Sequence, residues 1–274
     1  MHYIATITEC YEVPPVFQLN HTSSCESVVV HCFRYNPTCE LRERLGNFIL
    51  GKRLAKEDTQ PLRIVDVRFQ ISGGPILVDH GYSLYSAISR LLPEIHGDDQ
   101  IGIHPIYGKL IGERKLAITE SSRLVLRLPA DRLTDVLPLA GKTLDLGDGK
   151  IIVGVPNTQA LIPAASLKSR LVIIKGFMET EPFLEAVQRQ LDALEIRGRA
   201  SLVSTEDAVK TNVHRDGGTK SPWLRRTLRI SDKEIVGFAV RVDQLTAEES
   251  ICLQEHGVGG RRRFGCGIFV QERE

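Results

Sequence analysis

The same order of predicted elements occurs twice along the chain, in residues 62–161 and in residues 169–274. The first run opens with IVDVRFQI, in which apolar residues alternate with charged or polar ones, as in a strand with one buried face. A helix (VDHGYSLYSAISRLL), two strands, a second helix with Asp131 in its first turn and a hairpin turned at 147–149 follow. The second run has a strand, a helix (TEPFLEAVQRQLDALEI), strands, a helix (TAEESICLQEHGV) and a final strand.

This order fits two βαββαβ halves of the ferredoxin-like (RRM-like) kind. We therefore predict an α+β protein with two tandem ferredoxin-like domains, residues 62–165 and 166–274, and a glycine-rich loop before the last strand. Side-chain oxygens near a helix start can accept its first free backbone N–H groups. The expected capping residues are Asp79 or Ser83 for the first helix, Thr180 for the long helix, and the capping box Thr246–Glu249 for the last.

Residues 1–61 do not continue this pattern, and they contain Cys10, Cys25, Cys32 and Cys39. No CxxC pair occurs among them, so we expect no zinc site and no other metal or cofactor. The first residues do not resemble a secretory leader, which favours a cytoplasmic protein with reduced thiols. We expect residues 1–61 to be an accessory segment or, as we favour, the result of a start placed too far upstream of Leu62. A chain that starts near Leu62 and misfolds would contradict that interpretation.

The overall charge balance conceals two basic segments. The chain has 35 Lys and Arg against 34 Asp and Glu, which excludes a protein that binds nucleic acid over its whole surface. No apolar stretch approaches the roughly 20 residues that cross a bilayer, so we expect no membrane contact. Residues 197–229 are strongly basic and include the single tryptophan, which suits RNA backbone contact and base stacking. The alternative is an exposed loop with a packed tryptophan. The candidate RNA-binding residues are Trp223, Arg225, Arg226 and Arg229.

The second basic segment is GVGGRRRFGCGIF, residues 257–269, which follows a predicted helix and leads into the last strand. Glycines permit positive φ angles, and consecutive backbone N–H groups can form a nest for phosphate oxygens. Three successive arginines add bidentate phosphate donors. The alternative is a glycine-rich turn with a solvated charge run, but we favour phosphate binding. The candidate residues are Gly257, Gly259, Gly260, Arg261, Arg262, Arg263, Gly265 and Gly267.

Residues 79–109 concentrate side chains suited to proton transfer. Three of the eight histidines fall here, together with tyrosines and a lysine. Without a nucleophile motif, the chemistry that fits such groups beside a phosphate-binding loop is RNA cleavage by its own 2′-hydroxyl. The protein would orient that hydroxyl, accept its proton and stabilise the charged phosphorane. Candidate catalytic residues are His80, Tyr85, His96, His104 and Lys109.

The segments VDHGYSLYSAISRLLPEIHG, GIHPIYG and LQEHGVGGRRRFGCGIFV make the chain similar to the CRISPR-associated repeat-processing endoribonucleases (the Cas-six family, Myxan-type branch of the RAMP superfamily). The resemblance covers about residues 62–274. It implies metal-independent cleavage of CRISPR precursor RNA within its repeats, giving guide RNAs with 5′-hydroxyl and 2′,3′-cyclic phosphate ends. The alternative is a non-catalytic repeat-RNA-binding subunit of a CRISPR effector or transposon-targeting complex. The implied partners are repeat RNA and other effector subunits.

The resemblance also ranks the candidate residues. Its members commonly carry a tyrosine on the first helix and a histidine just past its end, which correspond to Tyr85 and His96. The lysine that often completes such a site has a less clear counterpart, for which Lys109 and His104 are candidates. His80 precedes the helix and is the alternative catalytic histidine. His96 could instead be an ordinary exposed loop residue.

Overall fold

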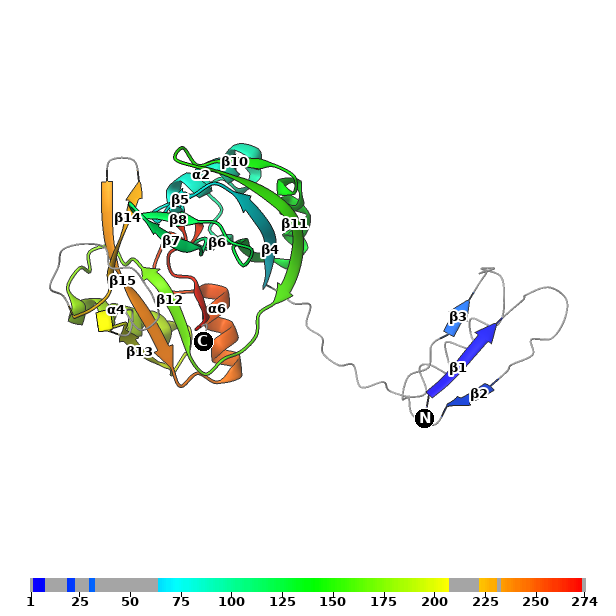
Figure 1. Cartoon of the computed structure of the whole chain (residues 1–274). Helices are drawn as coiled ribbons and strands as arrows, with labels where there is room; N and C mark the ends of the chain where they lie inside the picture. Colours follow the sequence, from blue (N-terminus) through cyan, green and yellow to red (C-terminus); the bar gives the residue numbers. More distant parts are fainter. Residues whose placement is uncertain are drawn as a thin grey trace. The chain divides into compact units, whose positions relative to one another are not determined.

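The structure is a computed structural model that describes residues 2–7, 19–22, 30–32, 64–206, 222–230 and 233–272. The chain divides into two compact units, residues 1–59 and 60–274. In the first unit the described residues form three short strands, in which β1 pairs antiparallel with β2 and parallel with β3 (Figure 1). Their bounds are His2–Ile7, Leu19–Thr22 and Val30–Cys32. Of the four early cysteines, Cys10, Cys25 and Cys39 lie outside the described residues.

The first large sheet of the second unit is built around β4 (Ile64–Gly73). Its side chains alternate as predicted, because Val65, Val67, Phe69 and Ile71 are buried and the residues between them are half-buried or exposed. The strand order is β10-β11-β4-β9-β6, and every neighbouring pair is antiparallel. The other strands are β6 (Gly102–Ile103), β9 (Arg123–Pro129), β10 (Thr143–Asp145) and β11 (Lys150–Ala160).

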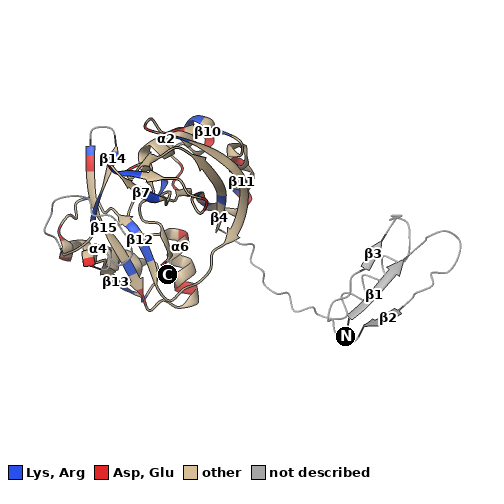
Figure 2. Ribbon diagram, in the orientation of Figure 1, with Lys and Arg blue, Asp and Glu red and all other residues tan. Residues whose placement is uncertain are grey.

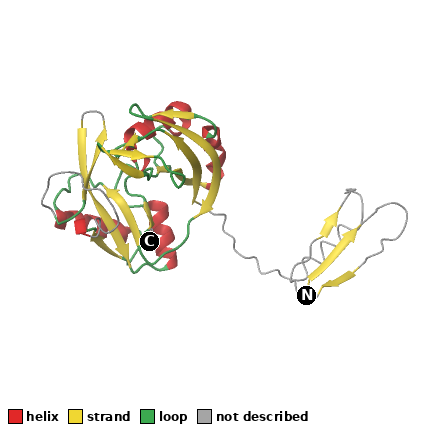
Figure 3. Ribbon diagram, in the orientation of Figure 1, coloured by secondary structure: helices red, strands yellow, loops and turns green. Residues whose placement is uncertain are grey.

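Helix α2 (Gly81–Leu91) contributes its apolar side to the core of this sheet (Figure 3). Leu84, Tyr85, Ala87 and Ile88 are buried there, and their spacing is that of one helical face. The helix therefore has a fixed rotation about its axis, and this rotation decides which of its polar groups reach the surface.

The second large sheet has the order β13-β15-β12-β16, and β14 pairs with β15. Phe183, Val187 and Leu191 from α4 pack with Phe238 and Val240 of β15 in its core, which α6 also enters. The elements are β12 (Leu167–Val172), α4 (Thr180–Ala193), β13 (Arg199–Leu202), β14 (Arg225–Ile230), β15 (Lys233–Asp243), α6 (Ala247–His256) and β16 (Phe269–Gln271).

The two sheets have corresponding strand positions. Strand β4 lies between β9 and β11, and β12 lies between β15 and β16, so in each sheet the strand that is first in sequence is flanked by two later ones. A helix follows each of these first strands. The mixture of helices and antiparallel sheets confirms the α+β class. A small sheet of order β5-β8-β7 completes the unit, with bounds Ile76–Leu77, Lys115–Ala117 and Lys109–Gly112.

One predicted helix is broken. Residues 130–139 form two short 3₁₀ turns, η2 and η3, on either side of a four-residue helix, α3. Pro138 lies at the start of the second turn, and because proline has no backbone N–H it cannot continue the helical hydrogen-bond series. The bounds are η2 (Ala130–Arg132), α3 (Leu133–Val136) and η3 (Leu137–Leu139).

The predicted caps are right at one helix and wrong at two. The Thr246–Glu249 capping box is present at α6. Helix α4 starts at Thr180 itself, with Glu179 before it and no side-chain cap. Helix α2 is preceded by His80, and the carboxylate of Asp79 instead accepts the backbone N–H of Arg229 on β14. None of the helices among the described residues is both long and apolar enough to cross a membrane.

Candidate functional site

Tyr85 and His96 are brought together at the end of α2. The chain leaves the helix, makes a 3₁₀ turn, η1 (Pro93–Ile95), and returns so that His96 Nδ1 lies 3.3 Å from Tyr85 Oη. The backbone N–H of Gly97 donates to the same hydroxyl at 3.0 Å. The hydroxyl oxygen can accept a second hydrogen bond, from His96 Nδ1–H, and in that tautomer Nε2 is the unprotonated ring nitrogen. Tyr85 is buried and His96 is exposed, so the tyrosine contacts one side of the imidazole and the other side faces solvent.

The glycine-rich loop, residues 257–269, packs against this pair. Within it Arg262–Phe264 form a 3₁₀ turn, η4. The ring of Phe264 meets Tyr85 edge-on at 5.1 Å between centroids, and the guanidinium carbon of Arg263 lies 5.7 Å from the centre of the Tyr85 ring. The segment predicted to carry acid–base residues and the segment predicted to bind phosphate are therefore in contact, although Tyr85 and Phe264 lie almost 180 residues apart in sequence.

Backbone contacts keep the loop in its shape. Gly257 and Gly267 have φ angles of 68° and 67°, and Val258 N donates to Gly267 O at 3.3 Å. A Cβ atom on Gly267 would lie 2.2 Å from Val258 O, and one on Gly257 would lie 2.2 Å from Gly267 O. Both distances are far below van der Waals contact, so only glycine fits at either position.

We expect Gly267→Ala to lower the free energy of unfolding by about 2 kcal/mol or more, because it adds a backbone clash to an unfavourable φ. Gly260→Ala is the matched control, since a Cβ there meets nothing within 4 Å and φ is not positive. Urea denaturation of both variants measures the difference. Equal unfolding free energies would contradict the assignment of the positive-φ glycines as structural.

The three consecutive arginines of the loop differ in position. Arg261 is exposed, and Arg263 lies over Tyr85. Arg262 turns inward, where its Nη1 donates to the His256 carbonyl at 2.9 Å and so meets the negative end of α6. Its Nε and Nη2 are buried and make no hydrogen bond within the described residues. Burial, and then the charge of Arg127, lower the pKa of Arg262 to about 10.

His80, the alternative catalytic histidine, is buried and fully engaged with backbone. Its Nδ1 lies 2.8 Å from the Leu77 carbonyl, and the Ile106 N–H donates to its Nε2 at 2.9 Å. A carbonyl only accepts and an amide N–H only donates, so the ring is neutral with its proton on Nδ1. Burial accordingly lowers the pKa of His80 to about 4. Neither ring nitrogen is left for a substrate.

Acid should therefore weaken the fold through His80. Its folded pKa lies below its ordinary value, so its contribution to stability is complete above about pH 6.5 and is lost as the pH falls toward 4. We expect a loss of about 2–3 kcal/mol between pH 7 and 4.5 from this group. Urea denaturation at pH 7 and 4.5 measures the free energy of unfolding. Between these pH values it should fall less in His80→Gln than in the wild type, whereas His256→Gln, at an exposed histidine, should show the same fall as the wild type. If the free energy of unfolding of His80→Gln depends on pH as in the wild type, His80 is not the group that weakens the fold in acid.

His104 and Lys109 do not join the Tyr85–His96 pair. His104 is buried, and its Nε2 lies 3.5 Å from Asp66 Oδ1, the outer limit of a hydrogen bond. Burial lowers the pKa of His104, and the contact with Asp66 only partly opposes this effect. Lys109 begins β7 in the small sheet and is exposed.

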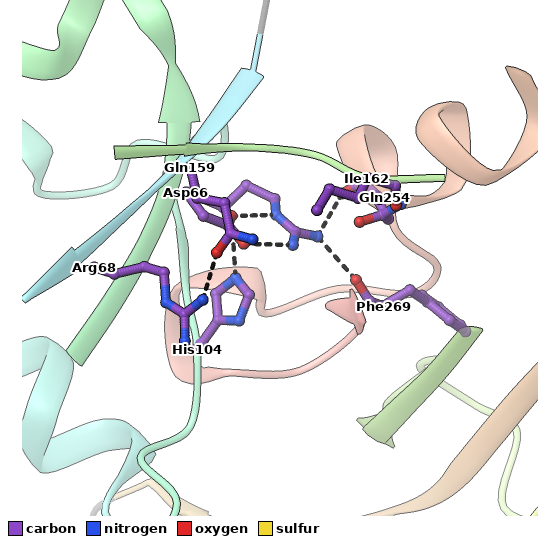
Figure 4. Close-up of polar contacts among 8 residues, drawn as sticks. Asp66, Arg68, His104, Gln159, Ile162, Gln254 and Phe269 are labelled. Atoms are coloured by element: carbon purple, nitrogen blue, oxygen red, sulfur yellow. Dashed lines mark hydrogen bonds and ion pairs between the residues drawn. The ribbon is translucent and has the colours of Figure 1, made fainter. Parts of the chain in front are cut away.

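Asp66, Arg127 and their neighbours form a buried network that sequence reasoning missed (Figure 4). Arg127 is 1% exposed and donates from Nε and Nη2 to the Asp66 carboxylate at 2.7 and 2.9 Å. Its Nη1 donates to the carbonyls of Gln254 on α6 and Phe269 on β16. Burial raises the pKa of Asp66, but the nearby His104 and the hydrogen bonds from Arg127 outweigh burial and leave that pKa well below its usual range. Asp66 and Arg127 are direct cross-strand partners, so opposite charges at matching strand positions were the available signal.

The candidates on β14 are only partly accessible. Arg229 is exposed, Arg226 is 6% exposed, and the Arg225 guanidinium lies 5.4 Å from the centre of the Phe238 ring. Trp223 is half-buried and packs against the second core, as in the alternative interpretation. Of the other basic residues in 197–229, Arg197 and Arg199 are exposed, and Lys210, Arg215 and Lys220 lie outside the described residues.

A cavity of about 470 Å³ lies between the elements of the two large sheets. Basic side chains from β9, β12 and β14 line it, and β12 and β14 carry blue segments in Figure 2. Lys168 is paired with Glu272 at 2.8 Å. The basic lining residues are Arg123, Lys168, Arg170 and Arg226.

Comparisons with known proteins agree with these features. Residues 65–274 match the family model described as Cas6 Crispr. The chain is 34% identical over 206 residues to the CRISPR-associated endonuclease Cas6 of Myxococcus xanthus, which covers 75% of this chain and 80% of that protein. Its fold is similar to that of a Cas6-related protein from Pyrococcus furiosus, with a TM-score of 0.52, 13% identity, and coverage of 77% and 100%. It is also similar to a structure described as an RAMP protein binding different RNA substrates, with a TM-score of 0.50, 12% identity, and coverage of 75% and 98%.

Proposed function

The chain belongs to the Cas6 family, and we propose that it is an endoribonuclease that cuts CRISPR precursor RNA within each repeat. The observation that carries this proposal is the contact between the Tyr85–His96 pair and the glycine-rich loop. This contact brings a solvent-facing histidine next to the arginines of the loop, whose guanidinium groups suit phosphate. The predicted backbone nest is not available, because the N–H groups of the five candidate glycines already donate within the protein. The Myxococcus xanthus relative, named as an endonuclease, supports the reaction class.

In the proposed reaction the RNA supplies its own nucleophile. The 2′-hydroxyl beside the scissile phosphate gives its proton to His96 as its oxygen bonds to phosphorus. The bond from phosphorus to the 5′-oxygen then breaks, and the leaving oxygen takes a proton from solvent. The products are a 2′,3′-cyclic phosphate and a 5′-hydroxyl, and no metal ion is needed. Tyr85 orients the imidazole through Nδ1, and this orientation leaves Nε2 for the substrate.

We also propose that residues 62–165 and 166–274 are two ferredoxin-like domains with the RNA bound across them. The matching positions of β4 and β12 in their sheets support this division. The basic cavity between the sheets offers a route for the RNA backbone away from the cut site. Such a protein would act in the cytoplasm, where it would deliver guide RNA to other CRISPR effector subunits.

The test uses two versions of the cognate repeat RNA, one unmodified and one with a 2′-deoxy nucleotide at the cut site, both incubated with the full chain in EDTA. We expect cleavage of the unmodified RNA alone, with a cyclic phosphate on the upstream product. Cleavage of both RNAs, or a requirement for a divalent cation, would refute 2′-hydroxyl attack. Tight binding without cleavage would favour the alternative, a repeat-binding subunit of an effector or transposon-targeting complex.

A further inference from the structure

Arg263 has the position of a cation for the scissile phosphate. Its guanidinium carbon lies 5.7 Å from the centre of the Tyr85 ring and 5.4 Å from that of Phe264, so it sits over the residue that orients His96. The side chain is one third exposed, and among the described residues it forms an ion pair with Asp99 at 3.5 Å. Asp99 is 95% exposed, and such surface pairs are weak, so a phosphate could replace it.

The backbone around Arg263 is held firmly in place. Phe264 N donates to Arg261 O at 2.9 Å, and Gly265 N donates to Arg262 O at 3.0 Å. The turn is also pressed against the start of α2, because a Cβ on Gly81 would lie 2.4 Å from Phe264 O. The backbone that carries Arg263 is therefore held against the start of α2 before RNA binds, so only the side chain has to be oriented for electrostatic stabilisation of a transition state.

The other cations considered for this role lie elsewhere. Lys109 is exposed on the small sheet, Arg262 turns toward the His256 carbonyl, and Arg261 makes no described contact with Tyr85 or His96.

We propose that Arg263 is a catalytic residue, whose planar guanidinium binds the non-bridging oxygens of the scissile phosphate and stabilises the charge of the phosphorane. This inference rests on the proposed endoribonuclease function and deepens it. A guanidinium can engage two phosphate oxygens at once through its fixed fork of N–H donors. The site then consists of a proton acceptor and its orienting hydroxyl from one half of the chain and a cation from the other.

The test separates cleavage from binding. Single-turnover cleavage is measured with the protein in saturating excess over repeat RNA, and affinity is measured with the uncleavable 2′-deoxy RNA. We expect Arg263→Ala to cut at least about 100-fold more slowly, while its affinity falls by no more than about 10-fold. Arg263→Lys keeps the charge and should recover part of the rate. Replacing one non-bridging oxygen with sulfur should slow the wild-type protein more than it slows Arg263→Ala.

Arg189→Ala is the matched control, since Arg189 also lies over an aromatic ring, that of Phe177 at 5.6 Å, but on α4. It should cut at the wild-type rate, and thermal unfolding of both variants checks the fold. If Arg263→Ala cleaves bound RNA at the wild-type rate, or if it loses affinity only, the assignment of Arg263 is overturned and the proposed function is not. A wild-type protein that binds repeat RNA but never cuts it would overturn the proposed function and this inference with it.

Discussion

His96→Ala should reduce single-turnover cleavage of repeat RNA by about 100- to 10,000-fold, the usual contribution of one acid–base group. The alanine removes the exposed ring but none of the buried core, so the protein should fold normally. Binding of 2′-deoxy repeat RNA should remain within a few-fold of wild type. The cleavage rate of fully bound RNA reports the effect on catalysis, and the affinity for the uncleavable RNA reports the effect on binding.

Tyr85→Phe is the partner variant, because it keeps the ring against Phe264 and removes only the hydroxyl that orients His96. We expect a smaller loss of rate than in His96→Ala. If His96→Ala cuts normally while His80→Ala or His104→Ala does not, the assignment of His96 is wrong although the reaction class stands. Loss of folding in the latter two variants is expected instead, since both histidines are buried.

Arg127→Met should destabilise the fold by about 3–5 kcal/mol near neutral pH, because it leaves the Asp66 carboxylate buried without its main partner. In the wild type, the depressed pKa of Asp66 supplies stability above its ordinary value of 3.8 that is lost in strong acid. In the variant the unpaired carboxylate should have a raised pKa, so the deficit should shrink as the pH falls toward 4. Urea denaturation at pH 7 and 4.5 measures both effects.

The double variant Asp66→Leu with Arg127→Met removes both charges and should be more stable than Arg127→Met alone. Lys150→Ala serves as the surface control, since its pair with Asp145 is exposed to solvent and should contribute little to stability. A loss in Arg127→Met no greater than that in Lys150→Ala would show that the buried network does not stabilise the protein.

Local patterns predicted most of the elements. The period of two in IVDVRFQI identified β4, and Thr246 with Glu249 identified the start of α6, since each pattern depends on neighbouring residues only. Tyr85 and His96 were singled out by the resemblance to the Cas-six family, and their contact is a finding of the structure.

Contacts between distant segments could not be predicted in this way. The polar face of β4 would ordinarily face solvent, but at Asp66 the neighbouring Arg127 is enclosed by backbone of α6 and β16, so Asp66 becomes a half-buried ion-pair partner. The Arg262 side chain turns inward because it donates to the His256 carbonyl, and the His80 ring is held in place because it accepts from the Ile106 N–H. Histidine and arginine side chains therefore looked equivalent in the sequence, although packing gives each a different role.

Arg127 also limits how this chain can evolve. Its guanidinium belongs to β9, but two of the carbonyls that satisfy it belong to α6 and β16. If β9 were combined with α6 and β16 of a relative, that relative would need backbone carbonyls at the same positions. Otherwise the Arg127 guanidinium would be buried without hydrogen-bond acceptors. The segments that form the two large sheets are therefore expected to diverge together, and hybrids that exchange only one of them should seldom fold.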